Sequence, residues 1–173
     1  MSVVDRQAIH DEMDRVVAQF RRLVRDASAS ELSRRSDGTR WTNQELLFHM
    51  LFGYLIVRAL LGMVRTAGRL PDAVGRTFAA TLNAGTRPFH VVNYLGSCGG
   101  ARVFHGGRLA AKFDRTVASL HRHLDAESDT ALEREMHFPV RWDPYFRDVM
   151  SLADVYRYGT RHFEHHRRQL TLP

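Results

Sequence analysis

The sequence contains almost no cysteine and almost no lysine. Cys98 is the only cysteine among 173 residues, which excludes an internal disulfide framework and is typical of a reducing compartment. Lys112 is the only lysine beside 24 arginines, so the net charge of +6 rests on arginine. A polyanion site gains from either cation, and these arginines are scattered with no run longer than a doublet. The charge therefore indicates codon bias of a G+C-rich genome rather than nucleic-acid binding.

Targeting and membrane-spanning signals are also lacking. The N-terminal residues 1–6 contain no apolar core of a signal peptide. The most apolar stretch, residues 46–64, includes His49 and Arg58, and a charge at the centre of a span costs about 3 kcal/mol. We therefore expect a cytoplasmic protein that binds neither membrane nor nucleic acid.

No strand pattern, internal repeat or linker interrupts the chain, whereas apolar residues recur at helical spacing in four long segments. These segments are residues 4–27, 42–66, 109–124 and 151–170. A capping box is expected at Thr42 and Glu45, and Asp154 is expected to partner Ser151 in the same way. The pattern predicts an all-α four-helix bundle in a single domain over residues 1–173.

The connections between these helices are harder to interpret. The region from Arg69 to Gly107 holds seven of the twelve glycines, so we expect a long irregular insertion between the second and third main helices. Within it, residues 72–83 are expected to form a short helix and residues 89–95 another short element. Residues 28–40 are expected to be a loop or short turn. The aromatic, proline-containing residues 136–146 can either line a pocket mouth, through Trp142, Tyr145 and Phe146, or simply pack.

Histidines on the last helix share its apolar face. On a helical wheel His162 and His166 fall on the buried stripe, while His165 points away from it. The stripe comprises Leu152, Val155, Gly159, Phe163 and Leu170. Two imidazoles four residues apart on an inward face have the geometry to bind one metal ion, although two hydrogen-bonded core histidines fit the same pattern.

The second helix supplies a third inward histidine, His49, which shares a face with Leu46 and Ile56. A lone histidine on such a stripe is more often a core residue than a ligand. However, Gly53 and Gly159 lie within about one turn of His49 and His162 and would leave room beside them. Three inward histidines from two helices favour a metal site with one coordination position left open, as in catalytic zinc sites.

Two segments resemble the motifs of the DinB-like superfamily. Residues 41–49, Trp-Thr-Asn-Gln-Glu-Leu-Leu-Phe-His, resemble W-[ST]-x-x-E-[IL]-[LI]-x-H, and residues 162–170 resemble H-x-x-x-H-x-x-Q-[IL]. The resemblance frames residues 5–170. It implies a four-helix bundle that is often dimeric, with a divalent metal ion held by His49, His162 and His166. Gln169 matches the glutamine of the motif and is expected to orient a ligand or a bound water.

The resemblance also implies an activity. Characterised members bind zinc or nickel and include enzymes that join a low-molecular-weight thiol, mycothiol or bacillithiol, to an electrophile, and a mycothiol-dependent maleylpyruvate isomerase. We therefore expect a zinc-dependent, or alternatively nickel-dependent, thiol S-transferase that takes a small thiol and a small electrophile and can form a homodimer. The alternatives are a hydrolase that activates water at the metal, a bundle that binds metal or a small ligand without catalysis, and, last, a DNA-associated protein.

The other candidate groups are expected to stay outside the site. His90, His105 and His137 lie in segments interpreted as irregular and could reach a metal, but we expect none to do so. The remaining helical histidines other than His165, namely His10, His121 and His123, are expected to be solvated. Cys98 is interpreted as a small residue in a tight loop rather than a nucleophile, since no base is paired with it in sequence.

Overall fold

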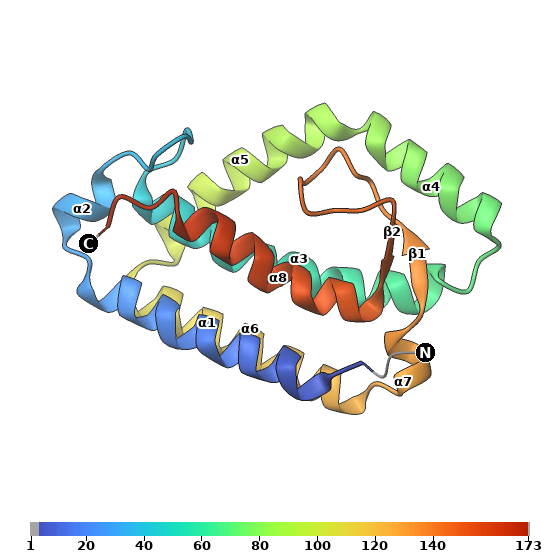
Figure 1. The fold of residues 1–173 in the computed structure, drawn as a ribbon. Helices are drawn as coiled ribbons and strands as arrows, with labels where there is room; N and C mark the ends of the chain where they lie inside the picture. Colours follow the sequence, from blue (N-terminus) through green and yellow to red (C-terminus); the bar gives the residue numbers. More distant parts are fainter. Residues whose placement is uncertain (1–3, 173) are drawn as a thin grey trace.

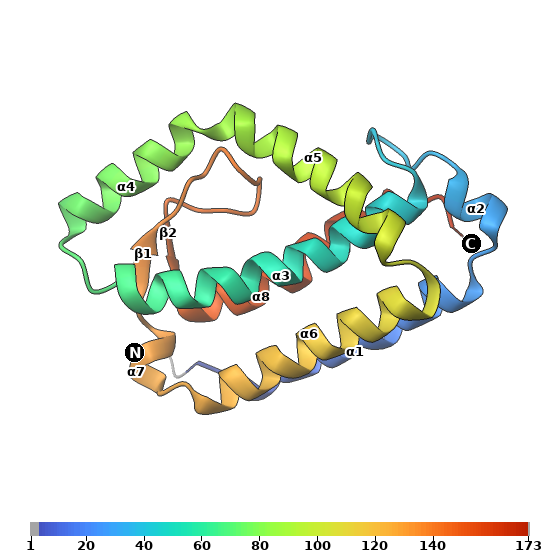
Figure 2. The same cartoon turned by 180° about the vertical axis from the view of Figure 1, so that it is seen from behind.

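Four long helices form the bundle in the computed structural model, which describes residues 4–172. The all-α fold class is therefore confirmed. In Figures 1 and 2 one layer contains the first and third of these helices and the other layer contains the second and fourth. They are α1 (Arg6–Asp26), α3 (Asn43–Ala67), α6 (Gly106–Ala126) and α8 (Leu152–Arg167).

The predicted capping boxes fix where α3 and α8 begin. The Glu45 amide donates to Thr42 Oγ1 and the Thr42 amide donates to the Glu45 carboxylate, at 3.3 and 2.9 Å. Ser151 and Asp154 make the same exchange at 3.1 Å in both directions. Each box satisfies amides that would otherwise have no partner in the first helical turn.

The long connection between α3 and α6 is mainly helical, which corrects the predicted irregular insertion, although its first part agrees with the short helix predicted at residues 72–83. It consists of α4 (Asp72–Ala84) and α5 (Thr86–Val103), which we call the arm. In Figures 1 and 2 the arm arches from the end of α3 back to its beginning, so that α6 runs parallel to α3. Neighbouring parallel helices need a long crossover, and the arm provides it.

Four of the seven glycines that suggested loops, Gly75, Gly96, Gly99 and Gly100, lie inside these helices. At Gly100 a Cβ atom would overlap the Phe48 ring, so this glycine lets α5 pack closely on α3. A Cβ atom added at Gly96 or Gly99 would have no neighbouring atom within 4 Å. A helical glycine costs about 1 kcal/mol relative to alanine, and at Gly100 alanine would not fit against Phe48.

Small elements occupy the remaining connections. The 28–40 segment, expected to be a loop or short turn, contains α2 (Ala29–Ser33), and α7 (Asp129–Leu132) follows α6. The strands β1 (Glu135–His137) and β2 (Val149–Ser151) pair antiparallel, with Met136 opposite Met150. The sequence did not predict this hairpin, because strands of three residues are too short to show an alternation of apolar and polar side chains.

Helix α3 is long and apolar enough to cross a membrane by length and composition alone. More than half of its apolar window is buried, against α8, α6 and α5. This burial is the pattern of a bundle core helix, in agreement with the sequence interpretation.

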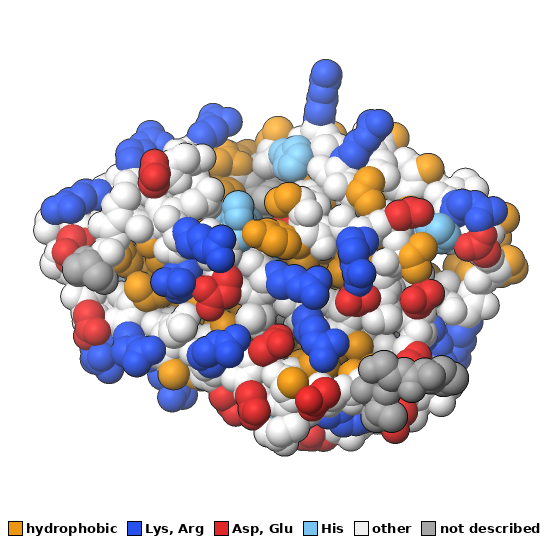
Figure 3. Space-filling view, viewed as in Figure 1, with side chains coloured by type: hydrophobic (Ala, Val, Ile, Leu, Met, Phe, Trp, Pro, Cys, Tyr) orange, Lys and Arg blue, Asp and Glu red, His pale blue; other side chains and the backbone are white. Residues whose placement is uncertain are grey.

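Charged side chains of both signs are interspersed on the face shown in Figure 3, with no area of one sign. Several ion pairs link different elements, among them Arg21 with Asp114 at 3.0 Å and Arg6 with Asp129 at 2.7 Å. Residues 1–3, part of the N-terminal segment inspected for a signal, lie outside the described residues. The charge on this face is spread over solvated helix surfaces.

Candidate metal centre

His49 on α3 meets His162 and His166 on α8 inside the bundle. His49 Nε2 lies 3.2 Å from Nε2 of His162 and 3.2 Å from Nε2 of His166. His49 and His162 are buried, and His166 is half-buried. Within residues 4–172, these three form the one group of three or more potential ligands close enough to hold a metal ion.

The spacing of the three nitrogens fits a divalent transition metal. Zinc–imidazole bonds of about 2.0–2.1 Å in a tetrahedral site place neighbouring ligand atoms about 3.3 Å apart. The two separations from His49 Nε2 agree with this value, and all three ligand nitrogens lie within 4.8 Å of one another. Three imidazoles are also a ligand set that zinc and nickel accept.

Two hydrogen bonds orient the histidines with Nε2 toward one another. Ser97 Oγ on α5 donates to the Asn93 carbonyl at 2.8 Å, so it is free to accept from His49 Nδ1 at 3.1 Å. Gln169 Oε1, which can only accept, lies 2.6 Å from His166 Nδ1. With Nδ1 protonated in both rings, the Nε2 lone pairs of His49 and His166 are available to a cation.

Gln169 reaches this position because α8 ends earlier than predicted. The helix stops at Arg167 rather than continuing to residue 170, and the Gln169 amide turns back to the His166 carbonyl at 3.0 Å. Gln169 is thus placed beside His166, where the sequence prediction put an orienting group.

The third ring, that of His162, is positioned by packing and not by a hydrogen bond at Nδ1 among the described residues. That nitrogen is buried. A Cβ atom at Gly53 would overlap this ring, so Gly53 makes the space that His162 fills. Gly159, which the sequence analysis placed beside the histidines, instead faces the Tyr54 ring at 3.0 Å.

Burial keeps all three imidazoles neutral. It lowers the pKa of His162 to about 3, with a smaller contribution from His165. Burial, followed by His162, lowers the pKa of His166 to about 3, and burial lowers the pKa of His49 well below its ordinary value. At neutral pH the three rings therefore carry lone pairs rather than charge, which a metal ligand requires.

A polar pocket of about 360 Å³ opens beside His166 and Gln169. The Trp41 ring stacks on His49 at 4.3 Å between centroids, and the Arg40 guanidinium lies over Tyr94 at 4.6 Å. The pocket is lined by Gly38, Thr39, Arg40, Trp41, His90, Asn93, Tyr94, His166 and Gln169.

Two lining residues of this pocket have buried polar atoms without partners in the described chain, Trp41 Nε1 and Asn93 Oδ1. Both atoms are shielded from solvent, so they are not open to a ligand in the pocket. Arg40, His90 and Gln169 in the wall have polar side chains, so the pocket suits a small polar molecule next to the histidines.

The remaining histidines lie outside the group. His90 lines the polar pocket, His105 is exposed, and His137 lies between Asp72 and Asp148 at 2.9 and 3.1 Å.

His10 and His121, expected to be solvated, are instead partly buried. They face each other through Nδ1 at 2.5 Å, and each Nε2 contacts a carboxylate. His123 is likewise only half-buried.

Cys98 lies within α5 rather than in a tight loop. Burial raises the pKa of its thiol, and a hydrogen bond to the Glu45 carboxylate raises it further. Both effects disfavour the thiolate, so the site gives no support to a nucleophilic role.

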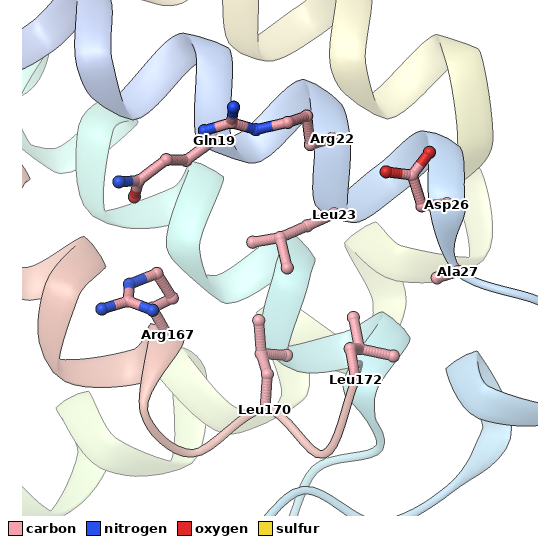
Figure 4. Close-up of a pocket in the computed structure, with 8 residues that line it drawn as sticks. All are labelled: Gln19, Arg22, Leu23, Asp26, Ala27, Arg167, Leu170 and Leu172. Carbon is pink, nitrogen blue, oxygen red and sulfur yellow. The ribbon is translucent and has the colours of Figure 1, made fainter.

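A separate hollow of about 560 Å³ lies between α1 and the C-terminal tail. Figure 4 shows Leu23 on α1 facing Leu170 and Leu172, with Arg22, Asp26 and Arg167 around them. None of the three grouped histidines lines it, so it is not part of the candidate metal centre.

The helical bundle and its three converging histidines define an all-α protein with a candidate metal centre. The chain belongs to the DinB superfamily, whose family model matches residues 12–170. No curated protein and no solved structure matches the chain. The family resemblance inferred from the two motifs is thereby confirmed.

Proposed function

We propose that this protein is a metal-dependent transferase that joins a low-molecular-weight thiol of the mycothiol type to a small electrophile. The observation that carries the proposal is the convergence of three neutral imidazoles, two buried and one half-buried, beside a polar pocket. Zinc is the first candidate ion and nickel the second. When bound, such a cation stabilises the thiolate form of a neighbouring thiol and so lowers its pKa.

The protein's own side chains orient the histidines, limit the access of water and bind the thiol. Ser97 and Gln169 hold two of the imidazoles in the tautomer that offers Nε2. Trp41 covers one side of His49 and limits the access of water. In the polar pocket, the side chains of Arg40, His90 and Gln169 supply hydrogen-bonding groups for a sugar- or amide-containing thiol.

Metal analysis of the purified protein tests the first half of the proposal. We expect about one divalent ion per chain in the wild type, and little or none in His49→Ala and His162→Ala. His165→Ala is the matched control, because His165 is next to His166 on the same helix and its Nδ1 contacts Tyr145 instead. Equal metal content in all four proteins would overturn the assignment of His49 and His162 as metal ligands.

A thiol-consumption screen tests the second half. Mycothiol, bacillithiol, glutathione and cysteine are each incubated with a panel of electrophiles, with the protein metal-free or loaded with zinc or nickel. We expect consumption of one thiol that depends on both metal and His49. Metal-dependent hydrolysis without loss of thiol would instead favour the hydrolase, and metal binding without turnover would favour a binding protein.

A further inference from the structure

An apolar cavity of about 260 Å³ lies between α3 and the arm, at the elbow where α4 meets α5. Leu60 and Met63 on α3, Phe78 and Leu82 on α4, and Phe89 on α5 form much of its wall. Segment 138–148 and α8 complete it.

Among the described residues that line the cavity, each hydrogen-bonding side chain has a partner. Tyr158 on α8 donates to Asp143 Oδ2 at 2.9 Å, and Asp143 Oδ1 accepts from the Tyr145 amide at 2.8 Å. Trp142 Nε1 donates to the Leu82 carbonyl at 2.8 Å. Every other lining side chain is apolar. A charged or strongly polar ligand would lose its hydration here without replacement, so the wall selects an uncharged apolar group.

Contacts at the elbow of the arm hold the cavity open. The Trp142 ring stacks on Phe89 with centroids 4.1 Å apart and planes within 10°, and the Arg141 amide donates to Asn83 Oδ1 at 3.0 Å. Because these contacts fix the arm against segment 138–148, the space beneath does not collapse. Its lining atoms lack packing partners, and an apolar occupant would supply them.

The cavity adjoins the candidate metal centre through Tyr158. The Tyr158 ring forms part of the cavity wall, and its centroid lies 5.6 Å from that of His162. The histidines thus have a polar pocket at His166 and an apolar cavity behind Tyr158.

We propose that this cavity binds the apolar part of the electrophile, an aromatic ring or short alkyl group of about six to ten carbon atoms, given that an apolar cavity of about 150 Å³ holds benzene. The assignment rests on the proposed function, since it divides the two substrates between the polar pocket and the apolar cavity. Trp142 and Phe146, for which the sequence left pocket lining and plain packing open, both line this cavity.

Binding of apolar probes to the protein as purified tests the assignment without requiring turnover. Toluene and 4-methylbenzoate are titrated and followed by saturation-transfer NMR. We expect toluene to bind and 4-methylbenzoate, its charged analogue, to bind at least about tenfold more weakly. Leu60→Trp fills the cavity and should weaken toluene binding at least about tenfold. Val92→Trp is the matched control, because Val92 is 65% exposed on the arm and does not line the cavity.

Circular dichroism establishes that each variant is folded. If Leu60→Trp is not, Ala59→Leu at the same wall replaces it and should weaken toluene binding in the same direction. Equal toluene binding in the wild type and the filled variant, or equal binding of the charged analogue, would overturn the assignment whatever the thiol screen shows. Where the screen finds turnover, Leu60→Trp should raise KM for the electrophile and leave KM for the thiol unchanged.

Discussion

Ser97 is the residue that most extends the site beyond its three histidines. It lies on the arm, is fully buried, and accepts from His49 Nδ1 while donating to the Asn93 carbonyl. Partners of this kind fix the ring and tautomer of a metal-binding histidine. Ser97 was not predicted from the sequence, because its part of the arm was expected to be irregular. No regular spacing in the sequence indicates that residue 97 lies next to residue 49.

Replacing Ser97 with alanine should lower metal affinity about 10- to 100-fold, because His49 Nδ1 loses its partner and the ring loses its orientation. Competition with a chromophoric chelator measures the change. Ser33→Ala is the control, since Ser33 is exposed on α2 and bonds only the Ser30 carbonyl. Unchanged affinity in Ser97→Ala would mean that packing alone orients His49.

Gly53 offers a second test at the residue scale. Gly53→Ala places a methyl group inside the His162 ring position, so we expect loss of most bound metal and destabilisation of about 1–3 kcal/mol. Gly62→Ala on the same helix meets nothing within 4 Å and should stabilise by up to about 1 kcal/mol through helix propensity. Denaturant unfolding with metal analysis measures both. Two variants with equal metal content and stability would show that the His162 ring can move aside.

At the scale of elements, the four bundle helices and the short helix α4 could be predicted, whereas the long helix α5 of the arm could not. Apolar side chains recur at helical spacing in α1, α3, α6 and α8, and this periodicity is a local signal. In α5 the decisive interaction is the contact of Gly100 with Phe48, some fifty residues away, and a glycine in the sequence reads first as a loop signal.

The histidine site was predictable for the same reason that the bundle was. His49, His162 and His166 lie on apolar helix faces, and the family motifs include them. The apolar cavity was beyond prediction, because it forms where the elbow of the arm meets segment 138–148. Neither segment shows a periodic pattern that would have placed it.

The fit of α5 on α3 can be tested with paired glycines. Gly100→Ala should push α5 away from Phe48, withdraw Ser97 from His49 and so weaken metal binding, with faster amide exchange in α5. Gly99→Ala, one residue earlier, meets nothing within 4 Å and should leave metal binding unchanged. Hydrogen exchange and chelator competition measure the two effects. If Gly100→Ala binds metal as tightly as Gly99→Ala, the arm does not support the site.

At the scale of the whole molecule, the net charge and the buried histidines act separately. The arginines are spread over solvated faces and pair with carboxylates between helices, as Arg21 does with Asp114. The three neutral imidazoles occupy the interior between α3 and α8, where they replace apolar packing by polar rings. Without a cation this arrangement brings nitrogen lone pairs together, so metal binding and fold stability should be linked.

This linkage predicts how stability depends on pH in the metal-free protein. His162 and His166 have pKa values of about 3 when folded, because of burial, against an ordinary value of 6.5. Between these values the unfolded chain binds more protons than the folded one, so the free energy of unfolding must fall as pH drops from 6.5 toward 3. Each imidazole contributes a slope of up to about 1.4 kcal/mol per pH unit. Above pH 6.5 this contribution is constant.

His162→Leu isolates the effect of one ring. Leucine cannot take up a proton, so the variant should lose less stability than the wild type between pH 6.5 and 4. Protonation of carboxylates lowers the free energy of unfolding of both proteins in the same range. Urea unfolding at several pH values, with chelator present, gives the two slopes. His105→Leu is the control, because His105 is exposed and its loss should leave the slope unchanged. If the free energy of unfolding falls equally with pH in the wild type and in His162→Leu, protonation of His162 does not unfold the bundle. The acid sensitivity of the protein would then have another cause than this buried ring.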